Sequence, residues 1–160
     1  MSLKAISIRG SYTGKGKQIL EDFFLPTLKK SIKYNRITGY YTIESLLAIS
    51  QGIETLFENN GTMRLIIGIH SIPADLIDAV SMKDALEDEI AEIRKEISKN
   101  LVSLESALDK KRIATLSWMI EDGLLEVKAA AVRGTGIFHP KTLIFEDSFG
   151  NEVVAVGSSN

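Results

Sequence analysis

The stretch Met63-Arg64-Leu65-Ile66-Ile67-Gly68-Ile69 is a nearly unbroken apolar run, and it decides the fold that we expect. Runs of this kind form strands that are covered on both faces. Upstream, residues 44–58 place apolar side chains at helical spacing, and residues 36–42 combine β-branched and aromatic side chains around Gly39. This succession predicts an α/β fold, with a mixed, largely parallel sheet sandwiched between helices. Ligands of such sheets bind at the carboxyl ends of the strands.

The same alternation extends to the N-terminus. Residues 4–9 alternate apolar and polar side chains and predict a first strand, which a glycine-containing loop ends. Residues 18–32 suit an amphipathic helix. Because Pro26 removes a backbone donor, this helix should begin late, kink or consist of two pieces.

Residues 74–122 predict a long helical insertion, since they contain neither proline nor glycine and their apolar residues recur every three or four positions. One helix of that length would be unusual, so we expect two or three helices with breaks near Ser81 and Asp109. The insertion would cover one side of the sheet. An alternative is that its apolar stripe forms a dimer interface.

The C-terminal part predicts further strands at residues 124–132, 138–145 and 153–156. Turn-forming residues at 147–151 separate the last two strands, which should pair as a hairpin. This hairpin would bring residues 157–160 back to the level of His139 and Lys141.

The composition fits a single soluble domain of 160 residues, 44% of them hydrophobic and 25% charged. No cysteine is present, which excludes disulfides and cysteine nucleophiles and favours a reducing cytoplasm. No window approaches the roughly 20 apolar residues of a membrane helix. Residues 1–64 carry nine Lys and Arg against five Asp and Glu, an excess that we interpret as a solvated face and not as a polyanion-binding one.

His139 and Lys141 are two residues apart in an apolar run. Side chains alternate between the faces of a strand, so both should project into one pocket. An imidazole can act as a nucleophile or proton donor, and an ammonium group can neutralise the charge of a phosphate. The pair therefore predicts phosphoryl chemistry.

Together, His139-Pro140-Lys141, the apolar strand and Gly157-Ser158-Ser159-Asn160 resemble the active-site signature of the phospholipase D superfamily. That signature is H-x-K, four residues, D, and then G-S-x-N. A weaker resemblance in residues 34–41 and 61–68 is to the nuclease-like branch found at the N-termini of bacterial helicase and restriction proteins. The resemblance spans roughly the full length and is strongest after residue 136.

The resemblance implies a role for each residue of the motif. His139 would attack phosphorus and form a phosphohistidine, and Lys141 would bind the phosphate. Ser158 and Asn160 would hold and orient it, with no metal and no cofactor. The acidic position falls on Glu146, with Asp147 beside it, and which carboxylate acts stays open.

The family's reaction uses two histidines, and this chain has one complete motif. The other histidine, His70, has Ile72 instead of a lysine two residues later, and we interpret it as a core or loop histidine. The resemblance therefore implies a homodimer in which two copies of His139 face each other. Since the family continues into a helix after the motif, we expect residues 1–160 to be one domain at the N-terminus of a longer protein, with any helicase domain downstream.

These features predict a cytoplasmic, metal-independent phosphodiesterase that acts as a DNA nuclease. Two alternatives stay open. The first is a non-catalytic module that grips the DNA backbone within a helicase or restriction protein. The second is a phospholipid hydrolase or transferase, which the lack of a basic amphipathic membrane face disfavours.

Overall fold

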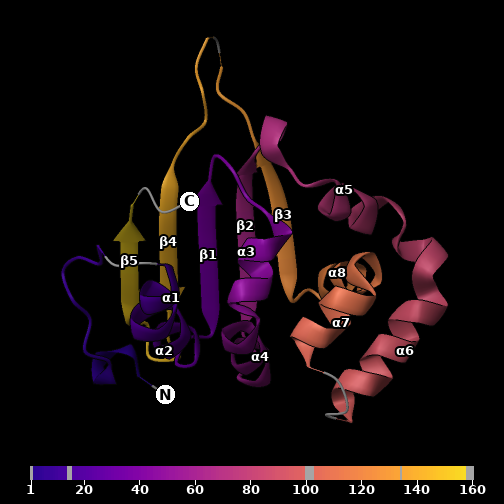
Figure 1. The fold of residues 1–160 in the computed structure, drawn as a ribbon, viewed down its shortest axis with the longest axis horizontal. Coiled ribbons are helices and arrows are strands. Elements are labelled where there is room, and N and C mark those ends of the chain that lie inside the picture. The colour runs from indigo at the N-terminus through magenta and orange to yellow at the C-terminus, as the bar shows by residue number, and fades with distance from the viewer. Residues whose placement is uncertain (1, 14–15, 100–102, 134, 158–160) are drawn as a thin grey trace.

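A computed structural model describes residues 2–13, 16–99, 103–133 and 135–157. A five-stranded sheet runs through the molecule in the order β3-β2-β1-β4-β5 (Figure 1). Its strands are β1 (Lys33–Thr38), β2 (Thr62–Gly68), β3 (Leu125–Ala130), β4 (Lys141–Glu146) and β5 (Glu152–Val156). The α/β class and the five strands predicted from residue 36 onward are confirmed, with shifts of a few residues at their ends.

Two of the four strand pairings are parallel and two are antiparallel, which corrects the expectation that the sheet is largely parallel. Strands β1 and β2 pair in parallel, as do β2 and β3. Strand β4 runs antiparallel to both β1 and β5, because a short turn joins β4 to β5 as the predicted hairpin. The carboxyl ends of β1, β2 and β3 therefore meet the start of β4 and the end of β5 at one edge.

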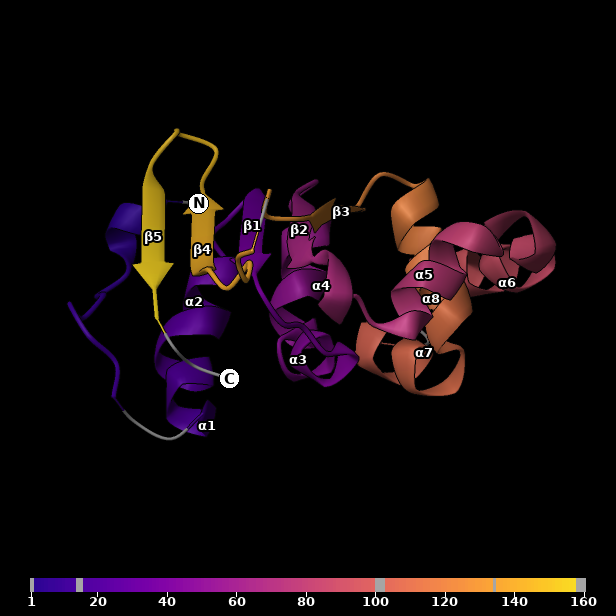
Figure 2. The same ribbon diagram turned by 90° about the horizontal axis from the view of Figure 1, so that it is seen from above.

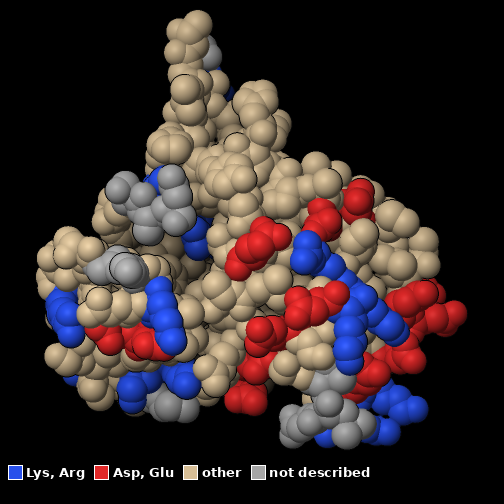
Figure 3. Space-filling view, in the orientation of Figure 1, with Lys and Arg blue, Asp and Glu red and all other residues tan. Residues whose placement is uncertain are grey.

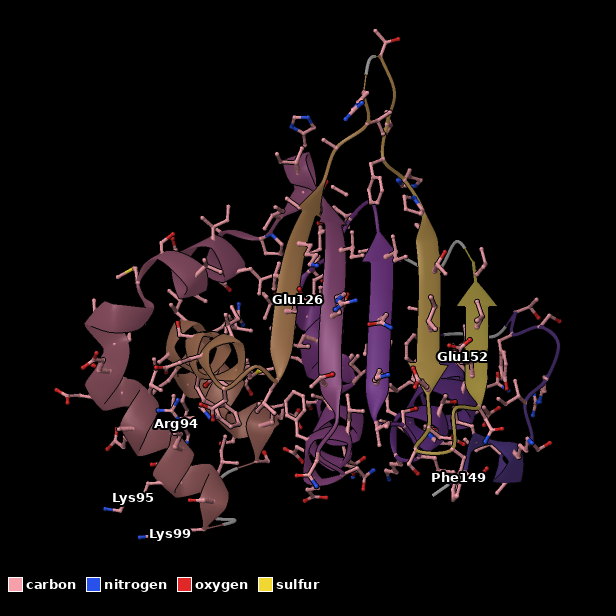
Figure 4. All side chains as sticks on the ribbon, turned by 180° about the vertical axis from the view of Figure 1, so that it is seen from behind. Arg94, Lys95, Lys99, Glu126, Phe149 and Glu152 are labelled. Atoms are coloured by element: carbon pink, nitrogen blue, oxygen red, sulfur yellow. The ribbon has the colours of Figure 1, made fainter. Side chains whose placement is uncertain are left out.

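In the part of the chain that the structure describes, helices cover one face of the sheet only, so the predicted sandwich is wrong (Figures 1 and 2). Strand β2 shows why. Met63, Leu65 and Ile67 are buried beneath the helices, whereas Arg64 is exposed and Ile66 half-buried on the other face. That open face is the one seen in Figure 4, where Glu126 and Glu152 lie on its strands.

The N-terminal segment forms no strand, contrary to expectation. It contains a short 3₁₀ turn, η1 (Leu3–Ala5), because the Ile6 N–H bonds to the Leu3 carbonyl and the Leu3 N–H to the Asp147 carboxylate. A helical run follows, made of α1 (Gly16–Ile19), the π-helical η2 (Leu20–Phe24) and α2 (Leu25–Leu28). The wider π turn ends two residues before Pro26 and divides the helical run, which agrees with the alternative of a helix in pieces.

Two helices link β1 to β2 and lie on the covered face. They are α3 (Ile43–Ala48), which Thr42 caps with its hydroxyl, and α4 (Ser50–Glu58). Helix α4 ends at Asn59, and Asn60 then adopts a left-handed φ of 57°. The predicted single helix over residues 44–58 is thus broken at Ile49.

The described residues of 74–122 are largely helical, as predicted, but the helices gather beyond the β3 edge and do not cover the sheet (Figures 1 and 2). They are α5 (Ala74–Ser81), η4 (Lys83–Leu86), α6 (Glu87–Ser98), α7 (Leu104–Lys110) and α8 (Arg112–Glu121). A further 3₁₀ turn, η3 (Ile69–Ser71), precedes α5. Ile90 and Ile93 of the apolar stripe are buried within the chain, so the alternative of a dimer interface along this stripe does not hold.

An aromatic cluster joins the N-terminal helices to the sheet. Phe145 of β4 stacks on Tyr34 of β1, with ring centroids 4.8 Å apart, and meets Phe23 edge-on at 5.6 Å. All three side chains are buried. Such pairs add roughly 0.5–1.5 kcal/mol each beyond the burial of their area, so this cluster fixes β4 against β1.

Candidate active site

The candidate site lies at the sheet edge where the parallel strands end. Thr38 at the end of β1 pairs with Lys141 at the start of β4. The Gly157 N–H, just beyond β5, donates to the Lys141 carbonyl over 3.1 Å. The predicted return of residue 157 to the level of Lys141 is thereby confirmed, whereas Ser158 and Asn160 lie outside the described residues.

His139 belongs to the segment between β3 and β4, which projects above the sheet (Figures 1 and 3). Strand β4 begins only after Pro140, which lacks an N–H but whose carbonyl still accepts from the Gly39 N–H over 3.0 Å. The imidazole is exposed. A Cβ atom on residue 39 would come within 2.9 Å of its Nδ1 atom, so the Nδ1 side of the ring packs on Gly39.

His139 lines a pocket of about 590 Å³, the carboxyl-edge pocket, whose walls come from the ends of β1, β2 and β3 and from the projecting segment. Glycines at the strand ends let the projecting segment pack closely on the sheet beside this pocket. A Cβ atom on residue 68 would stand 2.9 Å from the Gly39 carbonyl oxygen and 3.4 Å from that of Phe138. The second histidine of the chain, His70, lines the same pocket.

The loop alternative predicted for His70 is confirmed, and sequence reasoning missed only that this residue lines the pocket. The residue sits in η3, directly after β2, and is exposed instead of lying in the core. The signal was available, because a polar side chain immediately after a parallel strand lies at the ligand-binding edge. Among the residues that the structure describes, neither imidazole has a hydrogen bond or an ion pair.

Lys141 lies beside a second, cationic hollow of about 430 Å³, the basic groove, which Arg9, Arg36 and Lys141 line. The groove adjoins the covered face of the sheet. Arg36 on β1 and Lys141 on β4 lie on the same face as Tyr34 and Phe145, nearer to the edge that carries the candidate site. The Arg36 guanidinium stands 4.9 Å from the ring centre of Tyr41, which holds it by a cation–π contact. Burial raises the pKa of Tyr41, so this phenol stays neutral beneath Arg36.

The predicted single pocket is thus divided. His139 faces the carboxyl-edge pocket and Lys141 the basic groove, and the two hollows are neighbours where β4 begins. The division arises because His139 precedes the strand, so the alternation of faces that the sequence suggested does not extend to it. A phosphate at the start of β4 would have an imidazole on one side and three cations on the other.

Glu146 does not lie in this site. It ends β4 on the open face, about 17 Å from Lys141 along the strand, and its carboxylate pairs with the Lys33 ammonium at 2.9 Å. The length of β4 sets this distance, and antiparallel pairing places Lys33, the first residue of β1, opposite Glu146. Placing the acidic member of the motif at Glu146 therefore needs correction.

Asp147 has a structural role in the hairpin turn. Its buried carboxylate accepts hydrogen bonds from the backbone N–H groups of Leu3, Phe149 and Asn151 and from the Asn151 side chain. Burial alone would raise the pKa of Asp147, but these hydrogen bonds lower it well below its usual range. The acid thus fastens the N-terminal segment to the β4–β5 turn, and it too lies far from Lys141.

Comparisons with models of protein families, with curated proteins and with solved structures found no match for this chain. Within the described ranges, no group of three or more acidic, histidine or cysteine side chains is arranged to hold a metal ion. In the same residues, no helix is long and apolar enough to cross a membrane.

Proposed function

We propose that this protein is a phosphodiesterase of the phospholipase D type that cleaves DNA through a covalent bond to His139. One observation carries the proposal: an exposed imidazole without a competing partner in the described residues stands next to a groove lined by three cations, at the carboxyl ends of parallel strands. A nucleophile and a phosphate-binding surface are then adjacent.

In the first step, Nε2 of His139 attacks phosphorus, since the Nδ1 side of the ring packs on Gly39. The N–P bond forms, the bond from phosphorus to the leaving oxygen breaks, and that oxygen takes a proton. Water then attacks the phosphohistidine, the N–P bond breaks, and the imidazole is restored. The product is a phosphate monoester and a free hydroxyl.

Lys141, Arg36 and Arg9 would supply the charge that stabilises the phosphate during both steps. Fixed cations in a partly water-excluded site stabilise the charge of a transition state without reorganising. Arg9 is also paired, at 3.4 Å, with Asp22, whereas no acid lines the described part of the groove. This arrangement allows cleavage without a metal ion.

A second candidate is a module that grips the phosphate backbone of DNA without cutting it. The displacement of Glu146 from the motif favours this alternative, because the site then contains no carboxylate from the motif among the described residues. The basic groove would serve either function. A homodimer in which a second copy of His139 protonates the leaving oxygen is the assembly that the sequence resemblance implies for the cleaving form.

Labelled DNA incubated with the protein in excess chelator tests the proposal. We expect cleavage by the wild type, loss of cleavage to background in His139→Ala, and a fall of about 100-fold or more in Lys141→Ala. Lys95→Ala is the control, since this exposed lysine lies on α6 far from the site (Figure 4). Binding without cleavage by the wild type would favour the second candidate.

A further inference from the structure

The leaving oxygen needs a proton at the moment its bond to phosphorus breaks. The alkoxide of a sugar is a poor leaving group, and a positioned acid contributes roughly 10²–10⁴-fold to such a step. Under the proposed function, some side chain near His139 has to supply this proton.

The carboxyl-edge pocket contains that side chain. His70 and His139 both line it, from the ends of neighbouring parallel strands β2 and β1 and the segment that folds over them. Gly39 and Gly68 lie side by side at the ends of β1 and β2, and their lack of side chains lets Phe138 and His139 pack directly on the sheet at this pocket. A phosphodiester that entered the pocket would have both imidazoles in its walls.

The other groups of the pocket are poorer acids. No Asp, Glu, Lys or Arg belongs to its described lining, and the remaining hydroxyl groups are those of Tyr40 and Ser71. Imidazole exchanges protons near neutral pH far more readily than a phenol or an alcohol does. His70 is also exposed and makes no hydrogen bond or ion pair to the described residues, so its ring is available to a substrate.

We propose that His70 is the general acid of this site, acting in the same chain as the nucleophile His139. Its ring gives a proton to the leaving oxygen as the P–O bond breaks, and the neutral ring then takes a proton from the water that attacks the phosphohistidine. The proposal rests on the proposed function. It makes the site complete in one chain, without a second copy of His139.

Two substrates whose leaving groups differ in basicity distinguish a general acid at position 70 from a residue with a structural role. DNA needs the acid, whereas a p-nitrophenyl ester of thymidine phosphate releases a stable phenolate without it. We expect His70→Ala to lower the cleavage of DNA by about 100-fold or more and the release of p-nitrophenol by less than about threefold. Lys95→Ala, on α6 and away from the pocket, is the control and should cleave both substrates like the wild type.

Three results would overturn the assignment. DNA cleavage by His70→Ala at the wild-type rate would place the acid elsewhere, with a second copy of His139 as the first candidate. Equal losses on both substrates would make His70 a structural or binding residue. Activity restored by mixing His70→Ala with His139→Ala would show that the two imidazoles act across a dimer. A wild type inactive on both substrates, by contrast, would remove the proposed function itself.

Discussion

The imidazole of His139 rests on Gly39, so closely that a Cβ atom on residue 39 would stand 2.7 Å from the His139 Cα atom and 2.9 Å from its Nδ1 atom. The same Cβ atom would meet the Phe138 carbonyl oxygen at 2.4 Å. Two of these three neighbours are backbone atoms, which cannot move aside as a flexible side chain would. The glycine therefore sets the position of the proposed nucleophile.

Gly39→Ala should displace His139 and slow DNA cleavage. A displacement of about 1 Å at a reacting group costs up to about 100-fold in rate, and we expect a loss of that order with little change in DNA binding. Gly16→Ala is the control, because no atom lies within 4 Å of a Cβ at that position. Cleavage rates under single turnover measure the effect, and an unimpaired Gly39→Ala would contradict the placement of His139.

Arg36→Met should weaken DNA binding by removing one cation from the basic groove. We expect affinity to fall several-fold and the dependence of log Kd on log salt to decrease by about one unit of slope. Arg64→Met offers a matched control, since Arg64 lies on the neighbouring strand but on the open face, where it pairs with Glu126. If both variants bind DNA equally less well, the groove is not the binding surface.

Phe145→Ala should destabilise the fold by about 3–5 kcal/mol, because it removes the centre of the aromatic cluster and leaves a cavity. Phe149→Ala, four residues away, should change the free energy of unfolding little, since that ring is 72% exposed (Figure 4). Chemical denaturation of both variants measures the difference. Similar stabilities would contradict the packing of β4 against Phe23 and Tyr34.

Asp147→Asn should lower the melting temperature by about 5 °C at neutral pH, because an amide accepts the four hydrogen bonds less well than a carboxylate. The pKa of Asp147 is lower in the folded chain than its ordinary value of 3.8, so the stabilisation is present above that pH. It is lost as the pH falls below it. Melting curves of the two proteins should therefore converge below about pH 4, and a gap that widens there would contradict this role.

The strands from residue 36 onward and the hairpin could be predicted because local patterns decide them. The apolar run at residues 63–69 favours a strand in the interior of the sheet, and turn-forming residues separate β4 from β5. The open face could not be predicted, because the apolar run Met63–Ile69 is compatible both with a half-buried Ile66 and with an Ile66 that helices cover completely. Residues 4–9 alternate apolar and polar side chains as a strand would. They form no strand, and the Leu3 N–H just before them donates to the Asp147 carboxylate.

The shared sheet edge of His139 and Lys141 could be predicted from the sequence, whereas the surroundings of Glu146 and His70 could not. Spacing located His139, Lys141 and Gly157 at one sheet edge. Spacing along a strand already puts Glu146 about 17 Å from Lys141, but only the antiparallel pairing with β1 shows that it ends beside Lys33. Nor could spacing bring His70 to His139, because 68 positions of sequence separate two residues that the parallel strands place in one pocket.

The central claim is that His139 becomes covalently bound to phosphorus, and trapping this intermediate tests it most directly. The protein would be mixed with DNA carrying a labelled phosphate at the cleavage site, quenched in alkali within one turnover and digested for mass spectrometry. We predict an acid-labile, alkali-stable adduct on the peptide that contains His139, in which the labelled phosphorus is bound to the imidazole and still esterified to one DNA fragment, and none in His139→Ala. DNA cleavage with no phosphorylated histidine at any time point, or with the label on another residue, would contradict the account.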